Sequence, residues 1–315
     1  MIVTVTPNPS LDRTISVPTL ARGAVQKVTG DRVDAGGKGI NVARALALNG
    51  TATTAVLPVG GTVGDTIVAL LADAGVPVHA VRIAEAVRNN VAVVEDDGTT
   101  TKLNETGPTL TPLESGALDE AVCDLAVGAT WVVGSGSLPR GLGDDYFARL
   151  VADARAAGAR VAVDATGTPM TLALAAGPSL VKPNRVELAE VVGRDLPTLR
   201  DVVDAARELL ARGVEEVVVS LGRDGALLVT ADEVVHGIAT VDAPVSTVGA
   251  GDSLLAGYLH ATSAGAAPRD ALRTAIAFGS AAVALPGSTM PGPAQVAAVL
   301  VDITADPDPA MPLSD

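Results

Sequence analysis

The chain reads Ser246-Thr247-Val248-Gly249-Ala250-Gly251-Asp252-Ser253 between a strand-like run, residues 234–245, and an apolar helical run, residues 254–259. Two glycines therefore lie at a turn that opens a helix, with the carboxylate of Asp252 directly behind them. Free backbone N–H groups at a helix start attract anions, and glycine lets a phosphate approach the backbone closely. An aspartate there can accept a proton from a hydroxyl while the N–H groups hold the phosphoryl group that the hydroxyl attacks. The stretch predicts either phosphoryl transfer to an alcohol or, more simply, a glycine turn with Asp252 as a helix cap.

Apolar runs alternate with amphipathic segments along most of the chain. The runs at 130–133, 159–163 and 216–219 are typical of buried parallel strands. Helices are expected after the capping box that begins at Thr111, over residues 199–212, and over about 268–285. The alternation predicts a three-layer α/β/α fold with a mainly parallel central sheet, whose ligands gather at the carboxyl ends of the strands. We expect one domain over residues 1–304 and a disordered tail, 305–315, rich in proline and aspartate.

Two stretches, residues 11–34 and 89–106, interrupt this alternation. The first contains strand-like pieces at 13–17 and 25–33, and the second reads as a hairpin around Asp97-Gly98. We expect these pieces to form a small sheet apart from the main one. Because a small sheet with one apolar face needs a partner, it would cover the active site as a lid or pair with a second subunit. The alternative is that they are edge strands of the main sheet.

Composition excludes several classes of protein. The 315 residues carry a formal net charge of −14, which argues against nucleic acid and anionic membranes as partners. Cys123 is the only cysteine, so an intrachain disulfide and a cysteine-based zinc site are excluded. The N-terminus lacks the pattern of a signal peptide, and no apolar run approaches the roughly 20 residues that span a bilayer. A cytoplasmic protein is therefore expected.

A second glycine cluster, residues 34–43, also leads into a helix. It lacks the spacing of a Walker P-loop and the acidic ribose ligand of a dinucleotide fold. Gly36 and Gly37 would let the backbone approach a polyhydroxyl ligand, with Lys38 as an anion ligand and Asn41 as a hydroxyl ligand. The alternative is a capped helix start.

Asn184 and Glu187 open a further helix and lie three residues apart, hence on one face. An oxygen pair of this kind suits Mg²⁺ that is bound through water and phosphate. The same pair would also form a capping box, and the two interpretations are compatible. Residues 220–225 are a strand end and glycine turn that could contact a nucleotide.

Basic residues gather near the proposed lid and strand ends of this acidic chain. They are Lys27, Arg88, Lys102 and Arg140, the last of them in a glycine-serine turn at 134–141. Together they indicate a substrate that already carries phosphate, although each one singly is more often a solvated surface charge.

Taken in this order, the segments resemble the ribokinase-like PfkB carbohydrate kinases, from residue 4 to about residue 300. Residues 34–43 resemble the first signature of that family, and residues 248–253 resemble the second. The segments at 6–12, 87–91, 102–105 and 134–139 resemble its sugar-phosphate branch.

The resemblance implies a role for each matching residue. Asp252 resembles the catalytic base, and Gly249, Ala250 and Gly251 resemble the anion hole. Since Asp252 lies at a helix N-terminus, we expect its pKa to be lowered. The residues that resemble ligands of the sugar hydroxyls are Asp12, Gly36, Gly37 and Asn41. The candidates for the sugar's phosphate are Lys27, Arg88, Ser137 and Arg140. The residues that resemble nucleotide contacts are Lys182, Asn184, Ser220, Gly222, Gly225, Val248, Gly249 and Gly251, with Asn184 and Glu187 organising Mg²⁺.

The activity that the resemblance implies is ATP-dependent phosphorylation of fructose 1-phosphate at its 6-hydroxyl, giving fructose 1,6-bisphosphate. It also implies Mg²⁺ as cofactor and a homodimer through the β lid. Kinases acting on tagatose 6-phosphate or fructose 6-phosphate are the alternatives within the family. A non-catalytic sugar-phosphate sensor is the alternative from another class, and a nucleoside or ribose kinase would lack the phosphate-directed basic residues.

Overall fold

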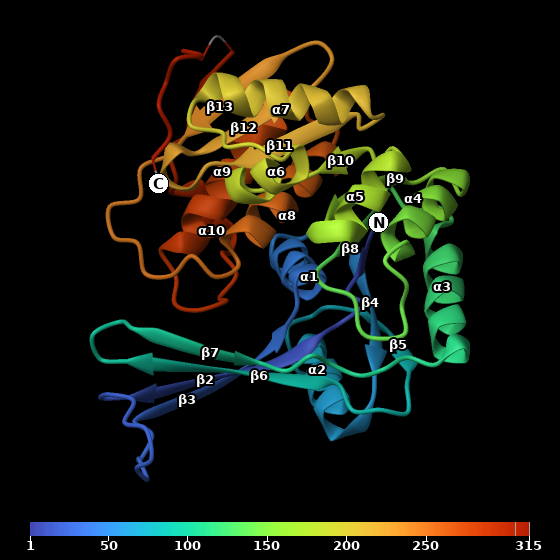
Figure 1. The fold of residues 1–315 in the computed structure, drawn as a ribbon, viewed down its shortest axis with the longest axis vertical. Helices are drawn as coiled ribbons and strands as arrows, with labels where there is room; N and C mark the ends of the chain where they lie inside the picture. Colours follow the sequence, from blue (N-terminus) through green and yellow to red (C-terminus); the bar gives the residue numbers. More distant parts are fainter. Residues whose placement is uncertain (306, 315) are drawn as a thin grey trace.

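The computed structural model describes residues 1–305 and 307–314, and in this part of the chain ten strands form a large sheet (Figure 1). In spatial order these strands are β14 (Asp302–Thr304), β13 (Val234–Ile238), β12 (Ala226–Val229), β11 (Glu216–Ser220), β10 (Leu180–Val181), β9 (Arg160–Asp164), β8 (Trp131–Ser135), β1 (Ile2–Val5), β4 (Thr53–Val59) and β5 (Val78–Arg82). All neighbours from β11 to β5 are parallel, whereas β12, β13 and β14 add in antiparallel fashion. The prediction of a mainly parallel central sheet is confirmed.

Helices cover both faces of this sheet, as the alternation predicts. One face carries α3 (Pro112–Ala126), α4 (Tyr146–Ala156), α5 (Gly167–Ala175), α6 (Arg185–Val192) and α7 (Leu199–Ala211). The other carries α1 (Lys38–Leu48), α8 (Ala250–Ser263), α9 (Pro268–Val283) and α10 (Pro293–Ala297), while α2 (Gly61–Asp73) packs beside β4 and the small sheet. The capping box at Thr111 and Glu114 is present, and α7 and α9 end within one or two residues of their predicted ends.

The core lies on both sides of the central strands, which explains their uninterrupted apolar sequences. In β8, Val132 packs into the cluster under α3–α7, whereas Trp131 and Val133 pack into the cluster under α1, α8 and α9. Successive side chains of a strand point to opposite faces, so a strand buried on both faces must be apolar at every position. With aromatic residues at only 2%, Ala, Val and Leu supply most of this packing.

A small, separate four-stranded sheet forms in the described residues, in the order β3 (Gly30–Gly36), β2 (Ser10–Val17), β6 (Arg88–Glu95) and β7 (Thr100–Asn104). Figure 1 shows it extending away from the main body, with α2 against its base. The prediction of a sheet apart from the main one is confirmed, and the edge-strand alternative is wrong. Strand β3 begins at Gly30, five residues later than expected, and β13 ends at Ile238, so residues 239–249 form a loop.

Cross-strand register gives this small sheet one polar and one more apolar face, since alternate residues of a strand point to opposite sides. One row across the sheet consists of Asp34, Asp12, Asn90 and Asn104. The next row, on the opposite face, consists of Val33, Arg13, Val91 and Leu103. The polar face therefore carries Asp12, a predicted sugar ligand.

The C-terminal tail differs from the disorder that its composition predicts. In residues 307–314, the carbonyl of Met311 accepts from the backbone N–H of Leu199 at 3.0 Å, and the N–H of Leu313 donates to Pro197 at 3.0 Å. The side chains of Met311 and Leu313 pack against the core under α3–α7, which compensates for ordering the chain. Residues 306 and 315, which the same prediction covered, lie outside the described residues.

Every helix in the described part of the chain is too short or too polar to cross a membrane.

Candidate active site

Asp252 lies in the first turn of α8, directly behind the predicted glycine turn. Gly249 precedes the helix with a φ of 77°, a left-handed conformation that favours glycine, and Ala250 is the first helical residue. Asp252 is only 8% exposed, and its Oδ2 accepts a hydrogen bond of 2.8 Å from Nδ2 of Asn41. Because Asn41 lies in the first turn of α1, the N-terminal turns of two helices meet at this carboxylate. The structure thus brings a predicted base and a predicted sugar ligand together.

The pKa of Asp252 rises to about 6. Burial is the main cause and the negative charge of Asp164 the next, while the hydrogen bond from Asn41 and the charges of Lys182 and Lys38 oppose the shift. The expectation that the helix N-terminus would lower this pKa was wrong, because desolvation of the buried carboxylate outweighs the helix dipole. A carboxylate with a pKa just below neutrality is a stronger base than an ordinary aspartate and is still mostly deprotonated at pH 7.

Asp164, the last residue of β9, lies at the centre of a charged cluster. Its buried carboxylate contacts Nζ of Lys38 at 2.8 Å and Nζ of Lys182 at 3.3 Å, and Lys38 also lies 3.6 Å from Glu187. Burial opposes ionisation, but the two lysines hold the pKa of Asp164 below its usual value. Asp164 and Glu187 likewise raise the pKa of Lys38 against the effect of its own burial. Lys38, a predicted anion ligand, is thus a fixed positive charge beside the predicted base, Asp252.

Sequence reasoning missed Asp164. A usable signal was its position directly after the apolar run 159–163, at the carboxyl end of a buried strand. Polar side chains at that edge of a parallel sheet are where ligands gather.

Lys182 extends this cluster to the glycine turn. A β-carbon added to Gly251 would lie 3.3 Å from Nζ of Lys182, so the ammonium group lies next to the predicted anion hole. Lys182 is only 4% exposed and follows β10, which ends at Val181. Two lysines and two amide-bearing glycines therefore surround the space in front of Asp252, an arrangement that suits a transferring phosphoryl group.

The predicted nucleotide residues follow β10 and β11, at the same edge of the sheet. Asn184 caps α6: its Oδ1 accepts from the N–H of Glu187 at 2.8 Å, and Oε2 of Glu187 accepts from the N–H of Asn184 at 2.9 Å. The capping box is confirmed. A backbone bridge joins Asn184 to Ser220, the last residue of β11.

The turn after β11 carries two more of the predicted nucleotide contacts, Gly222 and Gly225. They enclose a short 3₁₀ turn, and a β-carbon on Gly225 would collide with the carbonyl oxygen of Gly237. Val248 is half exposed, and its N–H donates to Oγ of Ser246 at 3.2 Å.

The predicted sugar ligands Asp12, Gly36 and Gly37 lie where β2 and β3 meet α1. A β-carbon on Gly36 would collide with the carboxylate of Asp12, so only glycine leaves room for that side chain. Oδ1 of Asp12 accepts from Oγ of Ser10 at 2.6 Å and from Nδ2 of Asn90 at 2.9 Å. Gly37 is the residue before α1. These bonds hold the Asp12 carboxylate on the polar face of the small sheet.

Three predicted phosphate ligands, Arg88, Ser137 and Arg140, converge on Asn8 and the segment 105–107. The guanidinium of Arg88 donates to the carbonyl of Asn8 at 3.0 Å and to that of Glu105 at 3.1 Å. Nδ2 of Asn8 donates to Oγ of Ser137 at 3.2 Å, and Arg140 donates to the carbonyl of Gly107 at 3.3 Å. Nε of Arg88 is buried without a hydrogen-bond partner among the described residues, which leaves a donor for a ligand.

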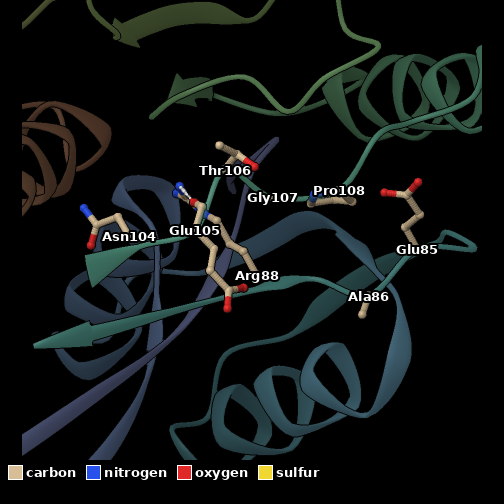
Figure 2. A pocket seen from close by; sticks show the side chains of 8 residues that line it. All are labelled: Glu85, Ala86, Arg88, Asn104, Glu105, Thr106, Gly107 and Pro108. Carbon is tan, nitrogen blue, oxygen red and sulfur yellow. Dashed lines mark hydrogen bonds between the residues drawn. The ribbon is translucent and has the colours of Figure 1, made fainter. Parts of the chain in front are cut away.

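An open pocket of about 570 Å³ adjoins this group. Figure 2 shows the side chain of Arg88 on one side of it, hydrogen-bonded to the backbone of Glu105. The residues that line the pocket are Glu85, Ala86, Arg88, Asn104, Glu105, Thr106, Gly107 and Pro108.

Lys27 and Lys102 are not part of this group. Lys27 is exposed in the loop between β2 and β3, near the end of the small sheet where Ser16 pairs with Gly30. Arg88 pairs with Ser10 at the other end, six residues away, or roughly 20 Å along the strand. Lys102 is exposed on the edge strand β7.

The described residues contain no cluster of three or more His, Cys, Asp or Glu side chains that could hold a metal ion. The cap uses Oδ1 of Asn184 and Oε2 of Glu187, and Oε1 of Glu187 lies 3.6 Å from Nζ of Lys38. Such a donor set fits a magnesium ion that is held chiefly by nucleotide phosphates and water, with these side chains around it.

Comparison with known proteins agrees with this geometry. A model of the pfkB family carbohydrate kinases matches residues 8–295. A 1-phosphofructokinase of Rhodobacter capsulatus is 40% identical over 96% of this chain and 96% of its own length. The ATP-dependent 6-phosphofructokinase isozyme 2 of Escherichia coli (strain K12) is 37% identical over 92% of this chain and 94% of its own.

Solved structures give the same result. The phosphofructokinase-2 of Escherichia coli in complex with substrates and products has a TM-score of 0.89 at 36% identity, with 94% of this chain and 97% of that chain covered. Because the family model and these relatives each span nearly the whole molecule, the chain belongs to the pfkB family of carbohydrate kinases.

Proposed function

We propose that this kinase transfers the γ-phosphoryl group of ATP to the 6-hydroxyl of fructose 1-phosphate, giving fructose 1,6-bisphosphate and ADP. The observation that carries the proposal is the pairing of Asp252 with Asn41 at a glycine-bearing helix start, beside the buried Lys182 and the partly buried Lys38. Arg88, Ser137 and Arg140 support a substrate that already carries one phosphate.

The reaction follows from these positions. Oδ of Asp252 takes the proton of the 6-hydroxyl as its oxygen attacks the γ-phosphorus, and the bond to the bridging oxygen breaks so that ADP leaves with the electron pair. The amides at Gly249–Gly251 and the ammonium of Lys182 stabilise the charge on the transferring group. A pKa of about 6 keeps Asp252 ready to accept a proton at neutral pH.

Magnesium, when bound, would neutralise charge on the nucleotide phosphates, and Asn184 and Glu187 would hold its water ligands. Ser220, Gly222, Gly225 and Val248 would border the nucleotide. The sugar would lie against Asp12 and Asn41, with Gly36 and Gly37 leaving room for its hydroxyls.

We propose further that the small sheet closes over the sugar with its polar face, and that a second copy of the chain covers the other face. Val33 and Leu103 on that face are 39% and 61% exposed, an apolar surface that calls for a partner. A solved structure of the E. coli phosphofructokinase-2 is described as a tetrameric inhibited form. Light scattering should therefore give a dimer mass for this protein, and the double variant Val33→Glu with Leu103→Glu should give a monomer.

The choice of acceptor rests on the relatives, several of which are named 1-phosphofructokinase. The E. coli isozyme named as a 6-phosphofructokinase keeps fructose 6-phosphate as the second candidate, with tagatose 6-phosphate beside it. An enzyme that uses ATP and a sugar phosphate is expected in the cytoplasm. ADP release should be measured with Mg²⁺ and a panel of fructose 1-phosphate, fructose 6-phosphate, tagatose 6-phosphate, fructose and ribose.

A kcat/KM for fructose 1-phosphate well above all others is the expected result. Preference for a 6-phosphate would move the acceptor assignment, and inactivity across the panel would favour a sugar-phosphate sensor. Asp252→Asn should lower kcat by roughly 10²-fold or more while both substrates still bind. Asp65→Asn, an exposed aspartate of α2, is the matched control and should keep full activity.

A further inference from the structure

The segment 286–290, between α9 and α10, touches the small sheet on one side. From β3, the guanidinium of Arg32 donates to the carbonyl of Pro286 and to Oγ1 of Thr289, both at 3.2 Å. Nε of Arg32 is held by Oδ2 of Asp34 at 2.6 Å. Arg32 and Asp34 both lie on the polar face of the sheet, and Asp34 pairs directly with Asp12 in the register. The contact therefore starts beside the proposed sugar site.

A second arginine, Arg44 of α1, joins the same parts of the molecule. Its NH1 lies 3.3 Å from the carbonyl of Ser288, 3.4 Å from that of Ala35, and 3.5 Å from Oδ1 of Asn41. Its NH2 lies 3.8 Å from Oδ1 of Asp34. One largely buried guanidinium thus contacts the small sheet, the amide that holds the catalytic carboxylate, and the segment 286–290.

The other side of this segment packs against the glycine turn. A β-carbon on Gly249 would lie 3.0 Å from Cε of Met290 and 4.0 Å from Cα of Ser288. Sδ of Met290 also lies 3.6 Å from Oγ of Ser253, the residue after the catalytic carboxylate. A displacement of residues 286–290 would therefore change the packing around Gly249 and shift the amides of the anion hole.

We propose that Arg32 and Arg44 are positioning residues that couple sugar-phosphate binding on the small sheet to nucleotide binding at the glycine turn, through residues 286–290. The inference rests on the proposed function, since it assigns the sugar to Asp12 and the phosphoryl group to the turn. A sugar bound at Asp12 fixes the position of β3. Because Arg32 and Arg44 contact both β3 and residues 286–290, this segment, which packs against Gly249, is then fixed as well. Coupling of this kind is reciprocal, so each ligand tightens the binding of the other by the same factor.

Calorimetric titrations test the coupling directly. The dissociation constant of a non-hydrolysable ATP analogue with Mg²⁺ is measured with and without saturating fructose 1-phosphate, and the reverse titration is run as well. We expect a coupling factor on the order of 5- to 150-fold in the unmodified protein. Arg32→Met and Thr289→Val each alter one partly buried end of the contact. In both variants this factor should fall to about twofold or less while each ligand alone binds within about twofold of its original affinity. Arg44→Met should act in the same direction.

Arg82→Met is the matched control, because it removes an arginine–aspartate pair of 2.6 Å, with Asp65, away from this contact. Its coupling factor should equal that of the unmodified protein. The inference is overturned if the unmodified protein shows no coupling, or if Arg32→Met and Thr289→Val keep the full factor. Weaker binding of a single ligand with the coupling factor retained would also overturn it, since that is the result of a merely structural role. Failure of the unmodified protein to bind either ligand would instead remove the proposed function and the inference with it.

Discussion

Replacing Asn41 by leucine should move the acid limb of the pH–rate profile to higher pH. Nδ2 of Asn41 donates to the Asp252 carboxylate over 2.8 Å, and both side chains are more than nine-tenths buried. A donor of this kind stabilises the charged form of the carboxylate, and it is one of the contributions that restrain the rise in the pKa of Asp252. Leucine has a similar size but no donor, so the substitution removes the hydrogen bond and keeps most of the packing.

The size of the shift follows from the strength of the bond. A hydrogen bond to a charged group contributes about 1.5–3 kcal/mol, and one pKa unit corresponds to about 1.36 kcal/mol. Loss of the Asn41 donor should therefore raise the pKa of Asp252 by roughly 1–2 units, from about 6 to roughly 7–8. The proposed role of Asp252 as base fixes the sign of the effect. A base works when deprotonated, so a higher pKa removes activity below neutrality and spares it above about pH 8.5.

The assay is kcat/KM for fructose 1-phosphate between pH 5 and pH 9, which reports the ionisations of the free enzyme and free substrate. The substrate phosphate titrates near pH 6 as well, but it does so equally in assays of the unmodified protein and of Asn41→Leu. The difference between the two pH profiles therefore reports the ionisation of the enzyme. Asn90→Leu is the matched control: it removes the amide bonded to Asp12 at 2.9 Å and should weaken sugar binding without moving the limb. An unmoved limb in Asn41→Leu, or an equal shift in Asn90→Leu, would refute the reasoning.

Three further changes have defined outcomes. Gly36→Ala should raise KM for the sugar phosphate roughly tenfold or more with nucleotide binding unchanged in calorimetry, because the new β-carbon must displace the Asp12 carboxylate. Asp164→Asn should move the acid limb to lower pH, the opposite of Asn41→Leu, because it removes a negative charge that raises the pKa of Asp252; a shift upward would contradict this electrostatic account. Deleting residues 305–315 should lower the free energy of unfolding in urea by roughly 2–3 kcal/mol through the loss of two packed apolar side chains, and an unchanged midpoint would mean that the tail is not docked in solution.

The fold was largely predictable because its signals are local. Buried parallel strands require uninterrupted apolar runs, and the capping boxes at Thr111 and Asn184 mark helix starts in three or four residues of sequence. The misjudged segments depend on distant partners. Residues 307–314 are ordered because Met311 and Leu313 pack against the core beside α7, and nothing in the proline- and aspartate-rich composition of this segment indicates that surface.

The candidate site shows the same division. Glycine turns at helix starts can be recognised from the sequence. The structure brings the residues near these turns into one cluster, namely Asp252, Asn41, Lys38 and Lys182. What the sequence could not supply was the balance between burial and helix dipole, so the direction of the Asp252 pKa shift was misjudged. Charge and family resemblance grouped Lys27 with the predicted phosphate ligands, whereas strand register places it at the far end of the small sheet from Arg88.

Asp164 connects these observations, although no motif pointed to it. Two lysine ammonium groups that both lie beside Asp164 would repel each other unless an anion lay between them. Asp164 supplies that anion, because it forms an ion pair with Lys38 and another with Lys182. It thereby holds two positive charges beside the glycine turn in a chain whose net charge is −14. The same negative charge raises the pKa of Asp252. The buried carboxylate of Asp164 therefore supports two features that the proposed phosphoryl transfer needs. It holds positive charge where the phosphates would bind, and it makes Asp252 a stronger base toward the acceptor hydroxyl. Asp164→Asn should for this reason weaken both phosphate binding and the base.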